Sequence, residues 1–255
     1  MSFGDTFTAR VNAALACKPR GLRTDPYIET RVDRSATPRS SRRWLSVDLG
    51  QSVDWTAICG GETTEHEDVT WQRGPYEREF SVSMRQRVLQ HTIGFLHRPR
   101  IGTPYPVIVQ QVSSLLGDMG GGDLVIDQTG VGRPVGDMMR AAGLRPLCVT
   151  ITAGNEASRP SPTDAHVPKM ILATTVQAVA QDARLRMAAD LPLREVVTAE
   201  LSAFSTKQRS SGYVGFEARD GEHDDLVLAI AIGLWWQENR PEPMHMHFVS
   251  LIGQM

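Results

Sequence analysis

The sequence predicts an α/β fold in which a mixed β-sheet is flanked by α-helices. Two apolar runs at residues 44–47 and 55–59 look like an antiparallel pair, and strands alternate with helices from residue 106 onward. Antiparallel strands followed by such alternation are typical of a mixed sheet with helices on its faces. With 255 residues the chain is long enough to bury one substantial core. We therefore expect a single α/β domain with peripheral segments.

The first half of this domain is expected to contain three strands and a helix, at residues 44–47, 55–59, 86–95 and 106–116. The first two strands are separated by Asp48-Leu49-Gly50, and the second closes at Gly60-Gly61, which favours a β-hairpin with an elaborated turn. Pro106 suits the first turn of the helix, and the glycines at 120–122 end it.

The second half alternates strands and helices. We predict strands at 124–126, 147–152 and 185–188, helices at 133–142, 168–183, 192–204 and 222–239, and a hairpin of 205–209 with 213–218. The turn at 128–132 joins a buried strand to a helix, so a β-α-β unit is expected here. The longest apolar run, 226–236, has 11 residues and suits a buried helix; it is too short for a membrane span.

Charge and composition predict the domain boundaries. Residues 1–43 carry 9 Lys or Arg and 4 Asp or Glu, a net of +5, whereas residues 44–255 carry 18 and 25, a net of −7. We therefore expect a basic, flexible arm at 1–43, the domain at 44–240 and a tail at 241–255. The arm is either a leader or a contact for nucleic acid or a partner. The three cysteines, Cys17, Cys59 and Cys148, form no Cys-x-x-Cys pair, and there is no apolar h-region, so an intracellular protein without disulfides is expected.

Acidic residues follow two buried strands and precede the last helix. Asp48 and Asp127 each end an apolar strand, and Asp224-Asp225 stands before the apolar run. The carboxyl ends of neighbouring strands meet at the sheet edge where ligands bind. Rigid but hydrated carboxylates suit a divalent cation such as Mg²⁺. An Asp at a helix start is also a common cap, but one cap accounts for one Asp only, so we predict a metal-binding catalytic site.

Glycines and a fourth acid accompany these residues. Gly50, Gly130 and Gly132 either allow a polyanionic substrate to approach the backbone or simply form tight turns. Asp54 is either a turn residue or an accessory acid of the site.

Four segments together resemble the nuclease domain of phage terminase large subunits, over about residues 43–239. They read VDLGQSVD at 47–54, VIDQTGVGRPV at 125–135, VPK at 167–169 and GEHDDLVLA at 221–229. The resemblance implies a fold of the ribonuclease H/retroviral integrase superfamily (RNase H-like). It also implies two Mg²⁺ or Mn²⁺ ions and cutting of packaged double-stranded DNA.

Carried over by position, the resemblance makes Asp48 the first strand acid, which would bridge the ions, and Asp127 the second, where many relatives have Glu. The third acid falls on Asp225 with Asp224 beside it. Asp54 matches an accessory acid, and His223 is expected to support the helix start. The residues expected to contact DNA are Arg133, Lys169, Lys207 and Arg209.

The expected partner is double-stranded DNA, and the expected location is the cytoplasm of a bacterial host. The sequence has no Gly-x-x-x-x-Gly-Lys-Ser/Thr loop, the phosphate-binding loop of packaging ATPases. We therefore also expect a separate packaging ATPase, a small terminase or a portal protein as a partner. Three alternatives stay open. Asp48-Leu49-Gly50-Gln51-Ser52 also resembles a phosphate loop of actin-like and sugar-kinase ATPases, which need two RNase H-like lobes. A catalytically inactive prophage module would bind DNA or a portal, and a Holliday-junction resolvase would share the chemistry.

Overall fold

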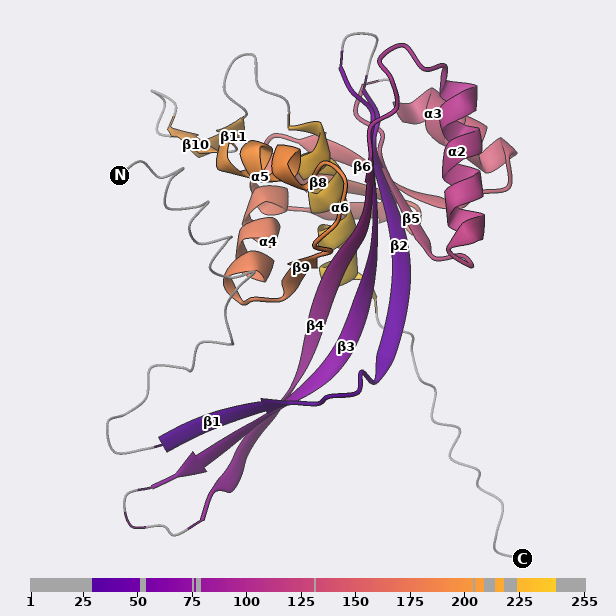
Figure 1. Cartoon of the computed structure of the whole chain (residues 1–255). Helices are drawn as coiled ribbons and strands as arrows, with labels where there is room; N and C mark the ends of the chain where they lie inside the picture. Colours follow the sequence, from indigo (N-terminus) through magenta and orange to yellow (C-terminus); the bar gives the residue numbers. More distant parts are fainter. Residues whose placement is uncertain are drawn as a thin grey trace, which may run out of the picture.

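The computed structural model describes residues 29–50, 54–74, 76, 79–130, 132–203, 205–208, 214–217 and 224–241. Within these residues the architecture is a nine-stranded mixed sheet with helices on both faces, and a separate two-stranded sheet (Figure 1). The predicted fold class is confirmed. None of the described helices is long and apolar enough to cross a membrane.

The centre of the sheet contains both parallel and antiparallel pairs. Its strand order is β7-β8-β6-β5-β2-β3-β4-β9, with β1 paired to β3. The strands are β1 Glu29–Arg34, β2 Ser40–Asp48, β3 Ala57–Arg73, β4 Ser81–His97, β5 Asp123–Asp127, β6 Pro146–Thr152, β7 Ser158–Ser161, β8 Asp164–Pro168 and β9 Leu185–Met187. β2 is antiparallel to β3 and parallel to β5, so two neighbouring strands end at the same edge.

Helices cover the two faces in separate groups. They are α2 Tyr105–Asp118, α3 Gly132–Ala141, α4 Lys169–Gln181, α5 Arg194–Ala203 and α6 Asp225–Asn239, and the small sheet pairs β10 Ser205–Gln208 with β11 Val214–Glu217. One core lies between the sheet and α4, α5 and α6, and the other lies beneath α2 and α3 (Figure 1). These elements confirm the predicted strands and helices to within a few residues, apart from longer β2, β3 and β4.

Alternation along β2 and β5 decides which face the acids occupy. Trp44 and Val125 belong to the core under α6, whereas Leu45 and Leu124 belong to the core under α2 and α3. Because side chains alternate along a strand, Asp48 lies on the face of Trp44, and Asp127 lies on the face of Val125. Both carboxylates therefore point to the α6 side of the sheet.

Trp44 fixes the distance between the sheet and α6. A Cβ atom placed on Gly61 of β3 would lie 2.3 Å from the indole, and one on Gly233 of α6 would lie 2.4 Å from it. Ser46 adds a hydrogen bond from its Oγ to the carbonyl oxygen of Ala229, at 2.6 Å. The absence of side chains at the two glycines lets α6 pack closely on the sheet at this point.

The predicted flexible arm at 1–43 is wrong for part of its length. Residues 29–34 form β1, which pairs with β3, and residues 40–43 begin β2. Together with the outer halves of β3 and β4 they make a ribbon that projects from the helical body (Figure 1). Arginines pair with acids across it, as in Arg34–Asp68 at 2.8 Å, so its basic residues are largely neutralised. Residues 1–28 and 242–255 lie outside the described residues.

Candidate metal centre

Asp48 and Asp127 lie side by side at the ends of adjacent parallel strands. The last paired residues of β2 and β5 are Val47 and Ile126, and each acid is the next residue along its strand. Their exposed fractions are only 8 % and 7 %. Two carboxylates that are predicted from sequence to meet at the sheet edge are therefore brought together and buried.

The electrostatics show that the helix acids belong to the same cluster. Burial raises the pKa of Asp48 well above its usual value, and the charges of Asp127, Asp225 and Asp224 raise it further, while Lys169 opposes them. Burial also raises the pKa of Asp127, against hydrogen bonds from Thr129 and Asp48. The charges of Asp127 and of the two helix acids thus act on the buried Asp48, and this repulsion favours a bound cation.

The turn after β5 holds one oxygen of Asp127. The backbone N–H and the hydroxyl of Thr129 both donate to its Oδ1, at 2.7 and 2.5 Å. Gly132 is needed in this turn, because a Cβ there would lie 2.5 Å from the carbonyl oxygen of Asp127; Gly50 is similarly crowded by the carbonyl oxygen of Trp55 at 2.3 Å. The close approach within each turn accounts for these two glycines without a substrate.

The two helix acids do not serve as ordinary caps. Asp224 is the N-cap residue of α6, but its side chain makes no capping hydrogen bond, and its Oδ2 lies 2.6 Å from Nζ of Lys169. Asp225 is 8 % exposed, and its Oδ2 lies 3.2 Å from Nη2 of Arg98. Capping therefore does not explain this pair of acids.

Glu200 of α5 caps the helix instead, and sequence reasoning missed it. Its Oε2 accepts hydrogen bonds from the backbone N–H groups of Leu226 and Val227, and its other oxygen binds Arg98. Burial raises the pKa of Glu200 to about 7, against the charge of Arg98. A signal existed in the sequence, because Glu200 shares a helical stripe with the buried Val197 and Leu201. Arg98 follows a strand end without any such signal.

The other predicted site residues are less directly connected with Asp48 and Asp127. Asp54 lines a hollow of about 180 Å³ with Gly50, Arg100 and Tyr105, and Arg133 is exposed in the first turn of α3. Lys169 is ion-paired with Asp224, so its predicted contact with DNA would have to compete with that carboxylate. The side chain of Lys207 and the whole of Arg209 and His223 lie outside the described residues.

The donor chemistry fits a hard divalent cation, although the ligand set is not preformed. Among the residues that the structure describes, no group of three or more His, Cys, Asp and Glu side chains is arranged closely enough to hold an ion as it stands. One oxygen of Asp224 is paired with Lys169, and one oxygen of Asp225 is paired with Arg98. Nevertheless, carboxylate oxygens are the ligands that Mg²⁺ and Mn²⁺ prefer, and a cation would relieve the repulsion around Asp48.

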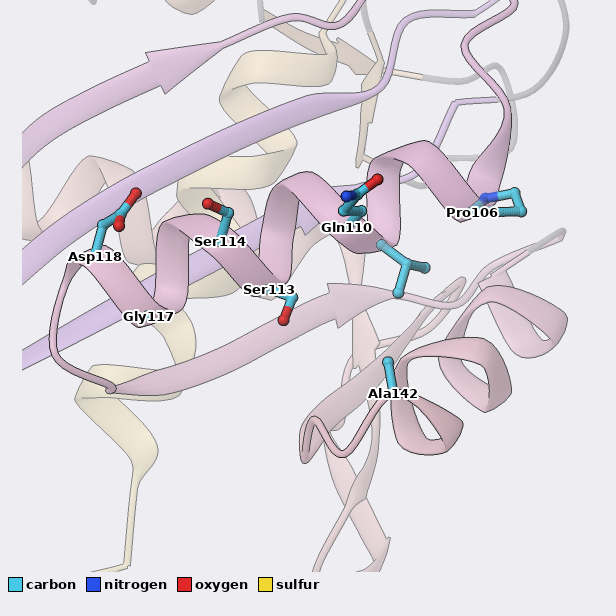
Figure 2. A pocket seen from close by; sticks show the side chains of 8 residues that line it. Pro106, Gln110, Ser113, Ser114, Gly117, Asp118 and Ala142 are labelled. Atoms are coloured by element: carbon cyan, nitrogen blue, oxygen red, sulfur yellow. The ribbon is translucent and has the colours of Figure 1, made fainter.

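A second, larger hollow lies on the other side of the sheet. Figure 2 shows this space of about 660 Å³ beside α2, lined mainly by small and uncharged residues, with Asp118 the only ionisable side chain. It belongs to the face covered by α2 and α3, whereas Asp48 and Asp127 point to the α6 side. It has no chemistry in common with the carboxylate cluster.

Comparison with solved structures identifies the fold. The large terminase nuclease of thermophilic phage G20c with bound magnesium aligns with a TM-score of 0.56 and 16 % identity, over 90 % of this chain and 96 % of that one. The same nuclease with bound cobalt aligns with a TM-score of 0.54 and 16 % identity, over 88 % of this chain and 96 % of that one. The large terminase nuclease domain of Thermus phage P74-26 aligns with a TM-score of 0.52 and 14 % identity, over 92 % of this chain and 97 % of that one.

No protein-family model and no curated protein matches the sequence. At such low identity the structural likeness concerns the fold, and it agrees with the mixed sheet and the helix-covered faces described above. The chain has the RNase H-like fold of the nuclease domains of phage large terminases.

Proposed function

We propose that this protein is a metal-dependent endonuclease that cuts double-stranded DNA during phage DNA packaging. The observation that carries the proposal is the pair of buried acids, Asp48 and Asp127, at the neighbouring ends of β2 and β5. Burial and the charges of Asp127, Asp225 and Asp224 raise the pKa of Asp48. The fold shared with metal-bound terminase nucleases supports it. The acids are separated in sequence by up to 177 residues, from 48 to 225, so they could form one metal centre only in the folded protein.

The residues would act through their carboxylate oxygens. Asp48 would be shared by two Mg²⁺ or Mn²⁺ ions, while Asp127 and Asp225, with Asp224 beside them, would each hold one ion. Bound there, the ions would supply an activated water and stabilise the leaving 3′ oxygen. Thr129 would keep Asp127 oriented through its two hydrogen bonds. The accessory roles of Asp54 and His223, and DNA contacts by Arg133, Lys169, Lys207 and Arg209, belong to the same proposal.

The setting of this activity is also proposed. The substrate would be the phage genome in the cytoplasm of the bacterial host, and a packaging ATPase, a small terminase or a portal protein would deliver it. Actin-like and sugar-kinase ATPases need two RNase H-like lobes, whereas the described residues build one nine-stranded sheet. An ATP-binding assay separates this alternative from a nuclease.

The test combines metal binding with cleavage. Mn²⁺ should raise the melting temperature of the wild-type protein, and plasmid DNA should be nicked or linearised when Mn²⁺ or Mg²⁺ is added. Asp48→Asn should lose both effects. Asp225→Asn should lose cleavage and keep only weak Mn²⁺ binding through Asp48 and Asp127, whereas Asp190→Asn, a change at an exposed residue, should keep both effects. A wild-type protein whose melting temperature does not respond to Mn²⁺ would contradict the proposal. Metal binding without cleavage would favour an inactive DNA- or portal-binding module, and preference for branched DNA would favour a resolvase.

A further inference from the structure

Arg98, Glu200 and Asp225 form a hydrogen-bonded chain that joins three elements. Arg98 directly follows β4, Glu200 lies on α5 and Asp225 begins α6. Nη2 of Arg98 donates to an oxygen of Glu200 and also lies 3.2 Å from Oδ2 of Asp225. We infer that Arg98 and Glu200 are positioning residues, which fix the Asp225 carboxylate for the metal centre of the proposed function, on which this inference rests.

Glu200 fixes the backbone on which Asp225 is carried. The first N–H groups of a helix have no partner within it, and those of Leu226 and Val227 donate to Oε2 of Glu200 at 3.1 and 3.2 Å. A carboxylate at this end is further favoured by the helix dipole. The other oxygen of Glu200 is bound to Arg98. One buried carboxylate therefore determines both where the first turn of α6 lies and where the guanidinium beside it lies.

Arg98 fixes the side chain of Asp225. Its guanidinium carbon lies 5.8 Å from the centre of the Trp55 ring, and its side chain is only 13 % exposed. Its Nε is buried and has no hydrogen-bond partner among the described residues. Burying a donor without a partner is unfavourable, so the contacts of the guanidinium with the two carboxylates and Trp55 must stabilise it by more than this penalty. Its planar, rigid group can bind two carboxylates in one fixed geometry, which a lysine cannot reproduce.

The positioning of Asp225 by Arg98 and Glu200 matters because metal ligands must be held within about 0.5 Å of their working positions. Asp225 stands at the start of a helix, where its side chain could rotate away from Asp48. Partners of ligating groups usually change metal affinity by about 10-fold to 100-fold when they are replaced. Loss of Arg98 or Glu200 should therefore weaken metal binding, even though neither residue would contact the ion.

The test measures Mn²⁺ affinity by calorimetry or by electron paramagnetic resonance of the free ion, so that it does not depend on cleavage. Arg98→Lys should bind Mn²⁺ about 10-fold to 100-fold more weakly than wild type. Glu200→Gln, which keeps a capping oxygen but loses the charge, should show a smaller loss. Arg184→Lys is the matched control. The Arg184 side chain is also half-buried and ion-paired, but its partner is Glu238, so the Mn²⁺ affinity of this variant should equal that of wild type.

A double-mutant cycle separates positioning from general damage. If Arg98 acts through Asp225, adding Arg98→Lys to Asp225→Asn should weaken Mn²⁺ binding by less than about 2-fold. A full additional loss in that background, or wild-type affinity in both Arg98→Lys and Glu200→Gln, would overturn the inference alone. A wild-type protein that binds no Mn²⁺ would overturn the proposed function and the inference with it. Thermal melts of all variants report whether they fold. If Arg98→Lys does not fold, the Mn²⁺ affinity of Glu200→Gln tests the inference.

Discussion

Individual side chains form a buried polar chain on the α6 side of the sheet. The indole N–H of Trp44 donates to Oγ1 of Thr63 at 3.1 Å, and this hydroxyl lies 2.9 Å from Nδ1 of His91. Nε2 of His91 faces Glu238 at 2.7 Å, which also accepts from Arg184. Burial lowers the pKa of His91, so the ring is neutral, with its proton on Nε2 and its Nδ1 accepting from Thr63.

This chain should make the protein sensitive to acid. Burial alone would raise the pKa of Glu238, but hydrogen bonds from His91 and Arg184 outweigh it and lower the pKa to about 2. A depressed carboxyl pKa contributes stability that is present above the unfolded value of about 4.5 and is lost as pH falls toward 2. The lowered pKa of His91 has the same sign of effect, because the folded protein loses stability as pH falls below the unfolded value of about 6.5.

We therefore expect Glu238→Gln to lower the free energy of unfolding at pH 7 by about 1–3 kcal/mol, and to flatten its decline between pH 5 and pH 3. Urea denaturation over this pH range measures both effects. Glu156→Gln, at an exposed position outside the helices and strands, should leave the curve unchanged. An identical pH dependence for wild type and Glu238→Gln would contradict the account.

Among the elements, α6 depends most on close packing. It is buried on nearly every side, because it lies between the sheet and the other two helices of its face. Trp44 fills the space between Gly61 of β3 and Gly233 of α6. Since the indole is fully buried, it cannot move away from a new methyl group.

Gly233→Ala should therefore destabilise the protein by about 1–3 kcal/mol, despite the higher helix propensity of alanine, and lower the melting temperature by about 2–10 °C. Gly117→Ala in α2 is the matched helical control, because a Cβ there meets nothing within 4 Å; it should be neutral or stabilising. Calorimetry of the two variants decides the matter. Equal melting temperatures would show that Trp44 can be accommodated elsewhere.

Sequence periodicity predicted most of the elements that enter a core, but it missed β8, whose Ala165 and Val167 lie in the core under α6, and it missed β1 and β7, which contribute no core residue. The runs at 44–47 and 124–126 are buried on both faces, so they are apolar apart from Ser46. β1 and β7 consist mainly of polar, exposed residues, and ion pairs or backbone hydrogen bonds hold them. Long-range pairing of this kind leaves no local pattern.

For the candidate site, the position of Asp48 and Asp127 at the ends of neighbouring strands could be predicted from sequence. The acids at strand ends could be recognised, since a buried strand that stops at an Asp is informative in itself. Arg98 and Glu200 could not be connected with Asp225 from sequence, because the link exists only after three distant elements have packed together.

At the scale of the whole molecule, a compact body carries a projecting ribbon. Within the described residues, neither hydrophobic core contains a residue of 29–43 or 62–87. The ribbon is held by strand pairing and by surface ion pairs such as Arg39–Glu67 and Arg87–Glu65. Ion pairs at the surface contribute little each, so the ribbon should open more easily than the body.

Hydrogen exchange should resolve the two parts. Amides of β1 should exchange at least about 100-fold faster than those of residues 44–48 in β2, because opening β1 exposes no core. High salt should widen the difference by screening the ion pairs. Mass spectrometry of peptides from both strands provides the measurement, with β5 as an internal reference. Equal protection in β1 and β2 would mean that the ribbon and body unfold together.

The wide spacing of the clustered acids has a consequence for biosynthesis. β2 and β5, with Asp48 and Asp127, are made well before α6, which carries Asp225. At about 5–20 residues per second, a ribosome needs roughly 5–20 s to travel from residue 127 to residue 225. Throughout that interval the nascent sheet has two of its acids and lacks the others. The carboxylate cluster is thus completed late, when the final helix slides over Trp44, so translation itself delays the appearance of the finished centre.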